Sequence, residues 1–140
     1  MLNVTLLSQR VQEIHFVNHI ETSGKIELAN SFNFHVNFSD DNRSCRAQLY
    51  QSAKMKDDPD RLFISGEIVG FFRVDGMASV EDKRAVHIQC YNQLFPYLQS
   101  MLSFVAAGSG LPGFLIQKRA IDPNQIVLNP AASEESLPIV

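Results

Sequence analysis

The stretch RLFISGEIVGFFRVDG, residues 61–76, together with the residues after it, decides the fold class. Apolar side chains recur at every second position of this stretch, which is the period of a β-strand. From residue 79 to residue 110 the apolar side chains recur every three or four positions, which is the period of a helix. Strands followed by a helix predict an α+β fold with an antiparallel sheet, because parallel strands need longer crossover connections.

Three further strands are predicted upstream, which gives a four-stranded sheet. The clearest is SFNFHVNF, residues 31–38, where Phe and Val alternate with Ser, Asn and His. Residues 4–20 have strand character with a phase break near residues 8–10, which predicts a bulge or a helical turn. Residues 45–55 alternate weakly. The predicted turns lie at residues 21–25, 39–44 and 56–60.

The helix has clear end signals. Ser79 with Asp82 three residues later resembles a capping box. Gly108 and Gly110 predict its end. Pro96 lies inside the run and lacks a backbone N–H, so it is expected to kink the helix or to start a second helical segment.

Composition limits the class of protein. A chain of 140 residues with 45% hydrophobic and 19% charged residues is typical of one globular domain. The net charge of −3 and the lack of a basic stripe argue against nucleic-acid binding. The start has no signal-peptide pattern, and no apolar run has the length of a membrane span. Cys45 and Cys90 form no CxxC motif and suit a reducing compartment, so we expect a cytoplasmic protein without membrane insertion.

No motif in the sequence indicates catalysis. GSGLPG, residues 108–113, follows a helix instead of a strand, so we interpret it as a helix end and not as a dinucleotide-binding loop. His15 and His19 lie in a predicted strand, where their spacing does not suit a metal site. The acidic pairs lie in turns or in the tail, and no Ser/His/Asp or Cys/His arrangement is present. We therefore expect a protein that is not an enzyme and that binds no metal or cofactor.

The predicted strands contain more apolar residues than a single helix can cover. Residues 62–74 also place Phe63, Val69 and Phe71 on the second face of the sheet. Gly66 and Gly70 leave gaps on the first face, which predicts a bulge or a close approach of another backbone. The surplus predicts a subunit interface, a groove for a partner, or both; the alternative is that all of it is core.

The segment QCYNQLFPYLQSMLSFVAAGSGLPGFLI, residues 89–116, resembles the helix and following loop of the SecB export chaperones. In that family a Tyr is followed by an L-F-P-Y segment, and the helix ends in Gly before a Pro-containing crossover loop. EIVGFFRVDGM, residues 67–77, is similar to the family's last strand, and SQRVQEIHFVN, residues 8–18, to its first. The resemblance covers about residues 8–116.

The resemblance implies a sheet with helices on one side and a cytoplasmic homotetramer built as a dimer of dimers. It implies an ATP-independent holdase that binds unfolded polypeptides, keeps preproteins competent for the Sec translocase and delivers them to the motor ATPase SecA. The expected client-binding residues are Phe63, Val69, Phe71, Leu111, Phe114, Leu115 and Ile116. Residues assigned either to the oligomer interface or to the core are Tyr91, Leu94, Leu98, Met101 and Val105.

The sequence also departs from the family. Residues 122–140 are short and proline-broken, so the family's second helix is expected to be shortened or absent. The sheet acids that meet SecA in the family do not line up, and Ser65 stands where one Glu is expected. A chaperone dedicated to one client such as an antitoxin, a non-chaperone oligomeric protein and a small-ligand module remain alternatives. We expect a single domain over residues 1–128 and a flexible polar tail over residues 129–140.

Overall fold

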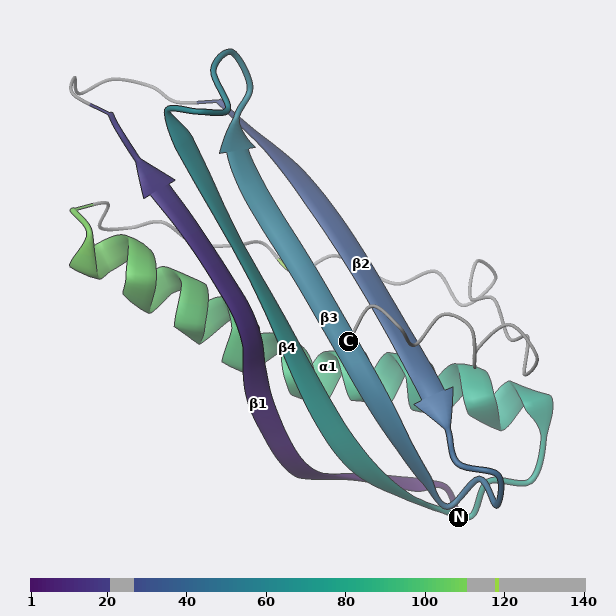
Figure 1. Ribbon diagram of the computed structural model, residues 1–140. Coiled ribbons are helices and arrows are strands. Elements are labelled where there is room, and N and C mark those ends of the chain that lie inside the picture. The colour runs from purple at the N-terminus through teal and green to yellow at the C-terminus, as the bar shows by residue number, and fades with distance from the viewer. Residues whose placement is uncertain (21–26, 111–117, 119–140) are drawn as a thin grey trace.

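The computed structural model describes residues 1–20, 27–110 and 118. Four antiparallel strands form one sheet in the order β1-β4-β3-β2, and one long helix follows them (Figure 1). This arrangement confirms the predicted α+β class, with strands first and a helix after them. The segment in which the second helix is expected to be shortened or absent, and the boundary at residue 128, lie outside the described residues. The elements are β1 (Asn3–Asn18), β2 (Leu28–Phe38), β3 (Ser44–Met55), β4 (Leu62–Asp75) and α1 (Val80–Gly108).

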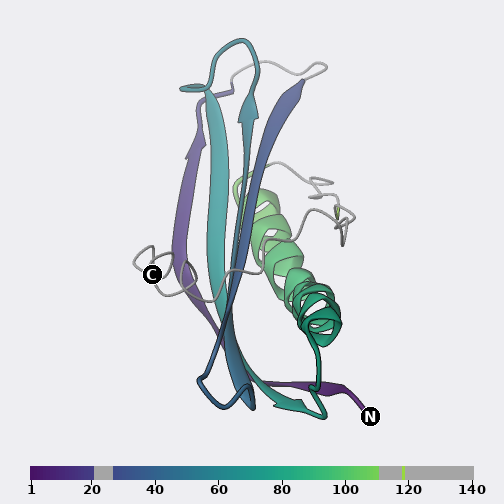
Figure 2. The same ribbon diagram turned by 90° about the vertical axis from the view of Figure 1, so that its right-hand side faces the viewer.

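The helix α1 covers one face of the sheet, and within the described residues no helix lies on the other face, which we call the helix-free face (Figure 2). It begins with the predicted capping box: Ser79 Oγ accepts from the backbone N–H of Asp82, and the Asp82 carboxylate accepts from the backbone N–H of Ser79. The helix continues through Pro96 without a second segment starting there. Pro96 lies on the exposed side, where water can hydrate the carbonyl that lost its N–H partner.

The strand β1 contains two irregularities in its pairing with β4. One register shift lies between Leu6 and Ser8, and a second lies between Val11 and Glu13. The first matches the predicted phase break and shows that a bulge, not a helical turn, causes it. Each shift adds one residue to β1 and so reverses the side to which the following side chains point. The apolar side chains after each extra residue therefore point to the helix-covered face again.

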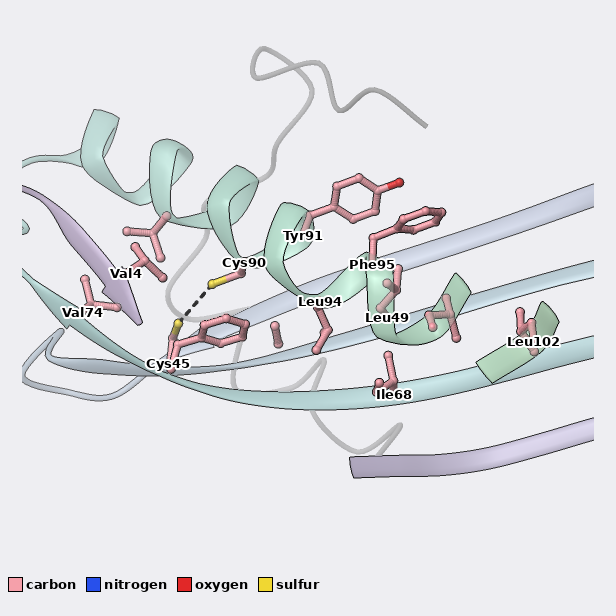
Figure 3. Packing of buried hydrophobic residues seen from close by; sticks show 14 of the residues in the cluster. Val4, Cys45, Leu49, Ile68, Val74, Cys90, Tyr91, Leu94, Phe95 and Leu102 are labelled. Atoms are coloured by element: carbon pink, nitrogen blue, oxygen red, sulfur yellow. Dashed lines mark hydrogen bonds between the residues drawn. The ribbon is translucent and has the colours of Figure 1, made fainter. Parts of the chain in front are cut away.

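The strand of residues 31–38 packs its apolar face against α1. Phe32 and Phe34 meet the ring of Tyr91 edge to face, with centroids 5.4 and 5.5 Å apart. Figure 3 shows how helix side chains such as Leu94 point onto residues of the sheet such as Leu49 and Ile68. The core therefore lies between α1 and one face of the sheet.

Side chains of α1 pack closely against Gly66 and Gly70 of β4. A Cβ built on Gly66 would lie 2.6 Å from Met101 Cε, and one on Gly70 would lie 2.8 Å from Leu94 Cδ1. Neither glycine marks a bulge in the pairing of β3 with β4. The atoms that approach both glycines belong to side chains and not to another backbone, so the gaps accommodate the packing of α1 side chains.

Cys45 and Cys90 are both free and buried, although 45 positions separate them in the sequence. The two Sγ atoms lie 3.6 Å apart between β3 and α1 (Figure 3). The hydrogen bond with Cys45 and burial raise the pKa of the Cys90 thiol. The two residues serve as small core side chains, as the sequence predicted.

His87 should make the stability of the fold depend on pH. Its ring packs 4.9 Å from the Phe34 ring, and burial, with a smaller effect of His35, lowers its pKa to about 4. The unfolded chain then binds more protons than the folded chain between pH 6.5 and pH 4, so the free energy of unfolding falls as the pH falls through this window. From pH 7 to pH 5 we expect a loss of about 2 kcal/mol through His87. Urea unfolding at both pH values measures this loss.

The variant His87→Gln provides the control for this prediction. It keeps a polar side chain at the position but removes the titration, so its unfolding free energy should change less between pH 7 and pH 5. An equal pH dependence in the variant and in the unaltered protein would show that another group is responsible.

Candidate functional site

The predicted client-binding residues that the structure describes lie on the helix-free face of the sheet. Phe63 and Phe71 are partly buried there, and Val69 has 0% of its surface exposed. Val69 therefore offers no surface to a client in this conformation. The other members of the predicted set lie outside the described residues; these are Leu111, Phe114, Leu115 and Ile116.

The helix residues assigned to interface or core separate into two groups. Tyr91, Leu94 and Leu98 are 1%, 0% and 0% exposed and belong to the core of the chain itself. Met101 and Val105 are partly buried and pack against that core. The large apolar side chains of α1 that a partner could contact are Tyr97 and Phe104, which were not among the predicted site residues.

The helix α1 crosses one face of the sheet obliquely, and its later part lies beside the edge strand β1 (Figure 1). At one end, Gln93 Nε2 donates to the Val4 carbonyl over 2.9 Å, and the Leu6 N–H donates to Gln93 Oε1 over 3.2 Å. At the other end, Asn18 Nδ2 donates to the Ser109 carbonyl over 3.4 Å. These polar contacts fix the two ends of a seam between the strand and the helix.

Exposed apolar side chains line this seam. Val11 and Ile14 pair across the sheet with Ile68 and Gly66, so their side chains are on the helix-covered face, yet they are 45% and 43% exposed. On the helix, Tyr97 and Phe104 lie one turn to either side of Met101, which approaches Gly66. Tyr97 is 47% exposed and Phe104 is 80% exposed. We name Val11, Ile14, Tyr97 and Phe104 the seam surface.

A hollow extends the seam surface toward the start of β1. It has a volume of about 520 Å³ and opens widely to the outside. The hollow could hold an apolar side chain of a bound polypeptide, because the aliphatic side chains of Val4 and Leu6 and the rings of Pro96 and Tyr97 surround the polar Gln93. Its lining residues are Val4, Thr5, Leu6, Asn92, Gln93, Pro96 and Tyr97.

The seam surface lies beside a free sheet edge. β1 is an edge strand of the sheet, and its outer side pairs with no other strand among the described residues. An unpaired edge presents backbone N–H and C=O groups that another extended chain can pair with. Leu7, at the first bulge of this strand, is also exposed, at 59%.

The outer side of α1 carries no charge over most of its length. From Ala85 to Gly108 the helix contains no Asp, Glu, Lys or Arg, although its outward positions include Asn92 and Ser100. A surface helix in a monomer normally carries charges on its outer side, whereas the centres of subunit interfaces are depleted of them. The composition of this helix is therefore that of a contact surface.

A signal for the seam surface existed in the sequence. Tyr97 and Phe104 are seven residues apart, which places them on one side of a helix. They sit beside the buried stripe, which includes Leu94, Leu98 and Leu102. Spacing alone does not separate the two stripes, because both have the helical period.

Neither a metal site nor a membrane span is found in the part of the chain that the structure describes. There, no three His, Cys, Asp or Glu side chains gather as a metal site would require. None of the helices in that part has the length and apolarity that a membrane span requires.

The described chain has a SecB-like fold, which confirms the resemblance seen in the sequence at the level of the fold. It is similar to the Mycobacterium tuberculosis SecB-like chaperone Rv1957 in complex with a ChAD peptide from the Rv1956 HigA1 antitoxin. The TM-score is 0.63 at 11% identity, with 84% of this chain and 88% of that chain covered. A protein of unknown function from Streptococcus agalactiae is similar at a TM-score of 0.52 and 13% identity, with 84% and 99% covered. No family model and no curated protein matches the sequence.

Proposed function

We propose that this protein is an ATP-independent holdase chaperone that binds unfolded or partly folded polypeptides on the seam surface. The observation that carries the proposal is the row of exposed apolar side chains beside an unpaired strand edge. Exposed apolar residues gathered in one place mark an interaction site more often than scattered ones do. The SecB-like fold supports the same class of function.

Two kinds of contact would hold a client. Each client side chain of Leu or Phe size that is buried against the seam surface contributes about 1.5–3 kcal/mol. Backbone pairing with the outer side of β1 adds affinity without demanding a particular client sequence. Together they favour unfolded chains, because a folded protein offers neither a free backbone nor a row of apolar side chains.

The loop residues Leu111, Phe114, Leu115 and Ile116 stay in the proposed client-binding set. They follow directly after α1 in the sequence. Phe63 and Phe71 also stay in the set as partly exposed aromatic residues of the helix-free face.

The proposal includes a homo-oligomer. The uncharged outer side of α1 supports an interface with a second copy of the chain. A dimer of dimers with α1 between its halves is the arrangement we propose, in the cytoplasm. Light scattering coupled to size-exclusion chromatography would measure the mass of the assembly.

The destination of the client has two candidates. One is the Sec translocase, with delivery to SecA. The other is a dedicated client such as an antitoxin, and this candidate is favoured by one observation: a chaperone of similar fold binds a peptide from an antitoxin. A non-chaperone oligomeric protein remains the alternative to both.

A holdase assay without nucleotide tests the proposal. A reduced, denatured model protein is diluted into a slight molar excess of this chain, and light scattering reports its aggregation. We expect aggregation to be suppressed, because the seam surface would bind the apolar segments that otherwise associate. Unchanged scattering would exclude a general holdase; purification of the native partner would then separate a single-client chaperone from a non-chaperone protein.

A further inference from the structure

The helix-free face of the sheet carries an unusual arrangement of two arginines around one aromatic ring. Phe71 of β4 lies between Arg10 of β1 and Arg46 of β3, which come from the two neighbouring strands. The guanidinium carbon of Arg10 is 5.7 Å from the ring centroid, and that of Arg46 is 5.9 Å from it. Both distances are within the range of cation–π contacts.

Among the described residues, no acid forms an ion pair with either of these two guanidinium groups. The ion pairs in the described ranges involve Arg61, Arg73 and Arg84, and none includes Arg10 or Arg46. The Nη2 atom of Arg46 is buried and has no hydrogen-bond partner. Burial and the nearby charge of Arg10 lower the pKa of Arg46.

The neighbouring acid Glu67 does not neutralise this pair. Glu67 raises the pKa of Arg46, but this effect is smaller than the lowering by burial and by Arg10. Glu67 Oε2 accepts a hydrogen bond from Gln48 Nε2 over 2.9 Å. Two adjacent cations with an unsatisfied donor are thus held on the helix-free face of a chain whose net charge is −3.

We propose that the helix-free face around Phe71 is a docking surface for an acidic polypeptide segment. A carboxylate placed between Arg10 and Arg46 would accept charge-assisted hydrogen bonds from both and would satisfy the donor of Arg46. An apolar side chain beside that carboxylate would pack on the exposed part of the Phe71 ring. In an extended segment every second side chain points to the sheet, so acidic and apolar residues can alternate in their contacts along it.

The occupant is a polypeptide and not a nucleic acid for a physical reason. Nucleic-acid binding rests on several cations that follow a phosphate backbone, and here two cations surround a single ring. This surface shares Phe71 with the proposed client-binding set, but it lies on the face of the sheet opposite the seam surface, and its preference for acidic segments does not depend on chaperone activity.

Fluorescence anisotropy on the full chain tests the proposal with a labelled decapeptide of the repeat Glu-Ser-Leu-Ser, in which the Glu and Leu side chains lie on the same side of an extended segment. The comparison peptide has Lys in place of each Glu and the same apolar content. We expect the Glu peptide to bind at least about tenfold more tightly, and its affinity to fall as salt is raised from 50 to 300 mM. Equal binding of the two peptides would overturn the proposal, because apolar contact alone would then explain it.

Substitutions locate the site. Arg10→Gln and Arg46→Gln should each weaken binding of the Glu peptide by about five- to tenfold. Arg10 is exposed, so its substitution leaves the core intact even if Arg46→Gln lowers stability. The control Lys54→Gln removes the same charge from the same face of β3, but it pairs with Phe63 and not with Phe71; we expect less than a twofold change.

Two outcomes would replace the proposal with another. An equal loss in Lys54→Gln would show general attraction without a site. A ten-nucleotide single-stranded DNA that binds as tightly as the Glu peptide, and is weakened by the same arginine substitutions, would indicate a phosphate site. The arginine variants should keep full suppression of aggregation in the holdase assay, so failure here is distinguishable from failure of the proposed function.

Discussion

The double variant Ile14→Asp/Phe104→Asp is expected to lose suppression of aggregation almost completely. Each substitution removes an apolar side chain that would contribute about 1.5–3 kcal/mol to client binding. Each also places a carboxylate where a bound client would exclude water, which adds a desolvation cost. Together these effects correspond to a loss of affinity of about a hundredfold or more, which light scattering at increasing chaperone concentrations would measure.

Both positions tolerate the change in the isolated chain. Ile14 is 43% exposed and Phe104 is 80% exposed, so the aspartates remain hydrated when no client is bound. The control variant Ser31→Asp/Asn33→Asp adds the same charge at exposed positions of β2, away from the seam. We expect this control to suppress aggregation as well as the unaltered chain does.

The mass of the assembly must be measured for the same variant. Loss of suppression with an unchanged mass would assign the seam surface to clients. Loss of both would assign it to contacts between copies of the chain. Full suppression by the double variant would remove the seam surface from the proposal and leave the loop residues after α1 as the candidate site.

The variant Phe72→Ala is expected to lower the free energy of unfolding by about 3–5 kcal/mol. Phe72 is 0% exposed on β4 and belongs to the core between the sheet and α1. The substitution loses the free energy gained when a large aromatic side chain is transferred out of water. It also leaves a cavity that the fixed strands cannot close. Unfolding in urea, followed by circular dichroism, measures the change.

Phe104→Ala is the matched control because it is the same substitution at an exposed position. In the isolated chain we expect a change of less than about 0.5 kcal/mol. A large cost at Phe104 as well would show that the residue is buried in solution, which would place it in an interface between copies of the chain.

Much of the local structure follows from the sequence because it depends on neighbouring residues. Alternation predicts the strand of residues 31–38 and its apolar face, since successive side chains of a strand point to opposite sides. The pair Ser79 and Asp82 predicts where the helix begins, since a capping box involves backbone groups three residues apart. The L-F-P-Y segment indicates the SecB-like fold, which the comparison of structures confirms.

The candidate site follows from the sequence only in part. The surplus of apolar residues indicates a contact surface, but the sequence does not show which residues form it. Leu98 and Phe104 belong to the same amphipathic helix, yet one is 0% exposed and the other is 80% exposed. Which of them is buried depends on how α1 lies on the sheet, and this is fixed where Gly66 and Gly70 let the helix approach.

The sequence by itself therefore determined the elements, the strand-then-helix order and the class of fold. The tertiary structure alone decided that β1 pairs with β4, which joins residues about sixty positions apart, and that Arg10 and Arg46 meet on either side of Phe71. The physical reason is the range of the interactions. Backbone periodicity and capping act over a few residues and leave a pattern in the sequence, whereas strand pairing and helix packing join distant residues through contacts that no local pattern records.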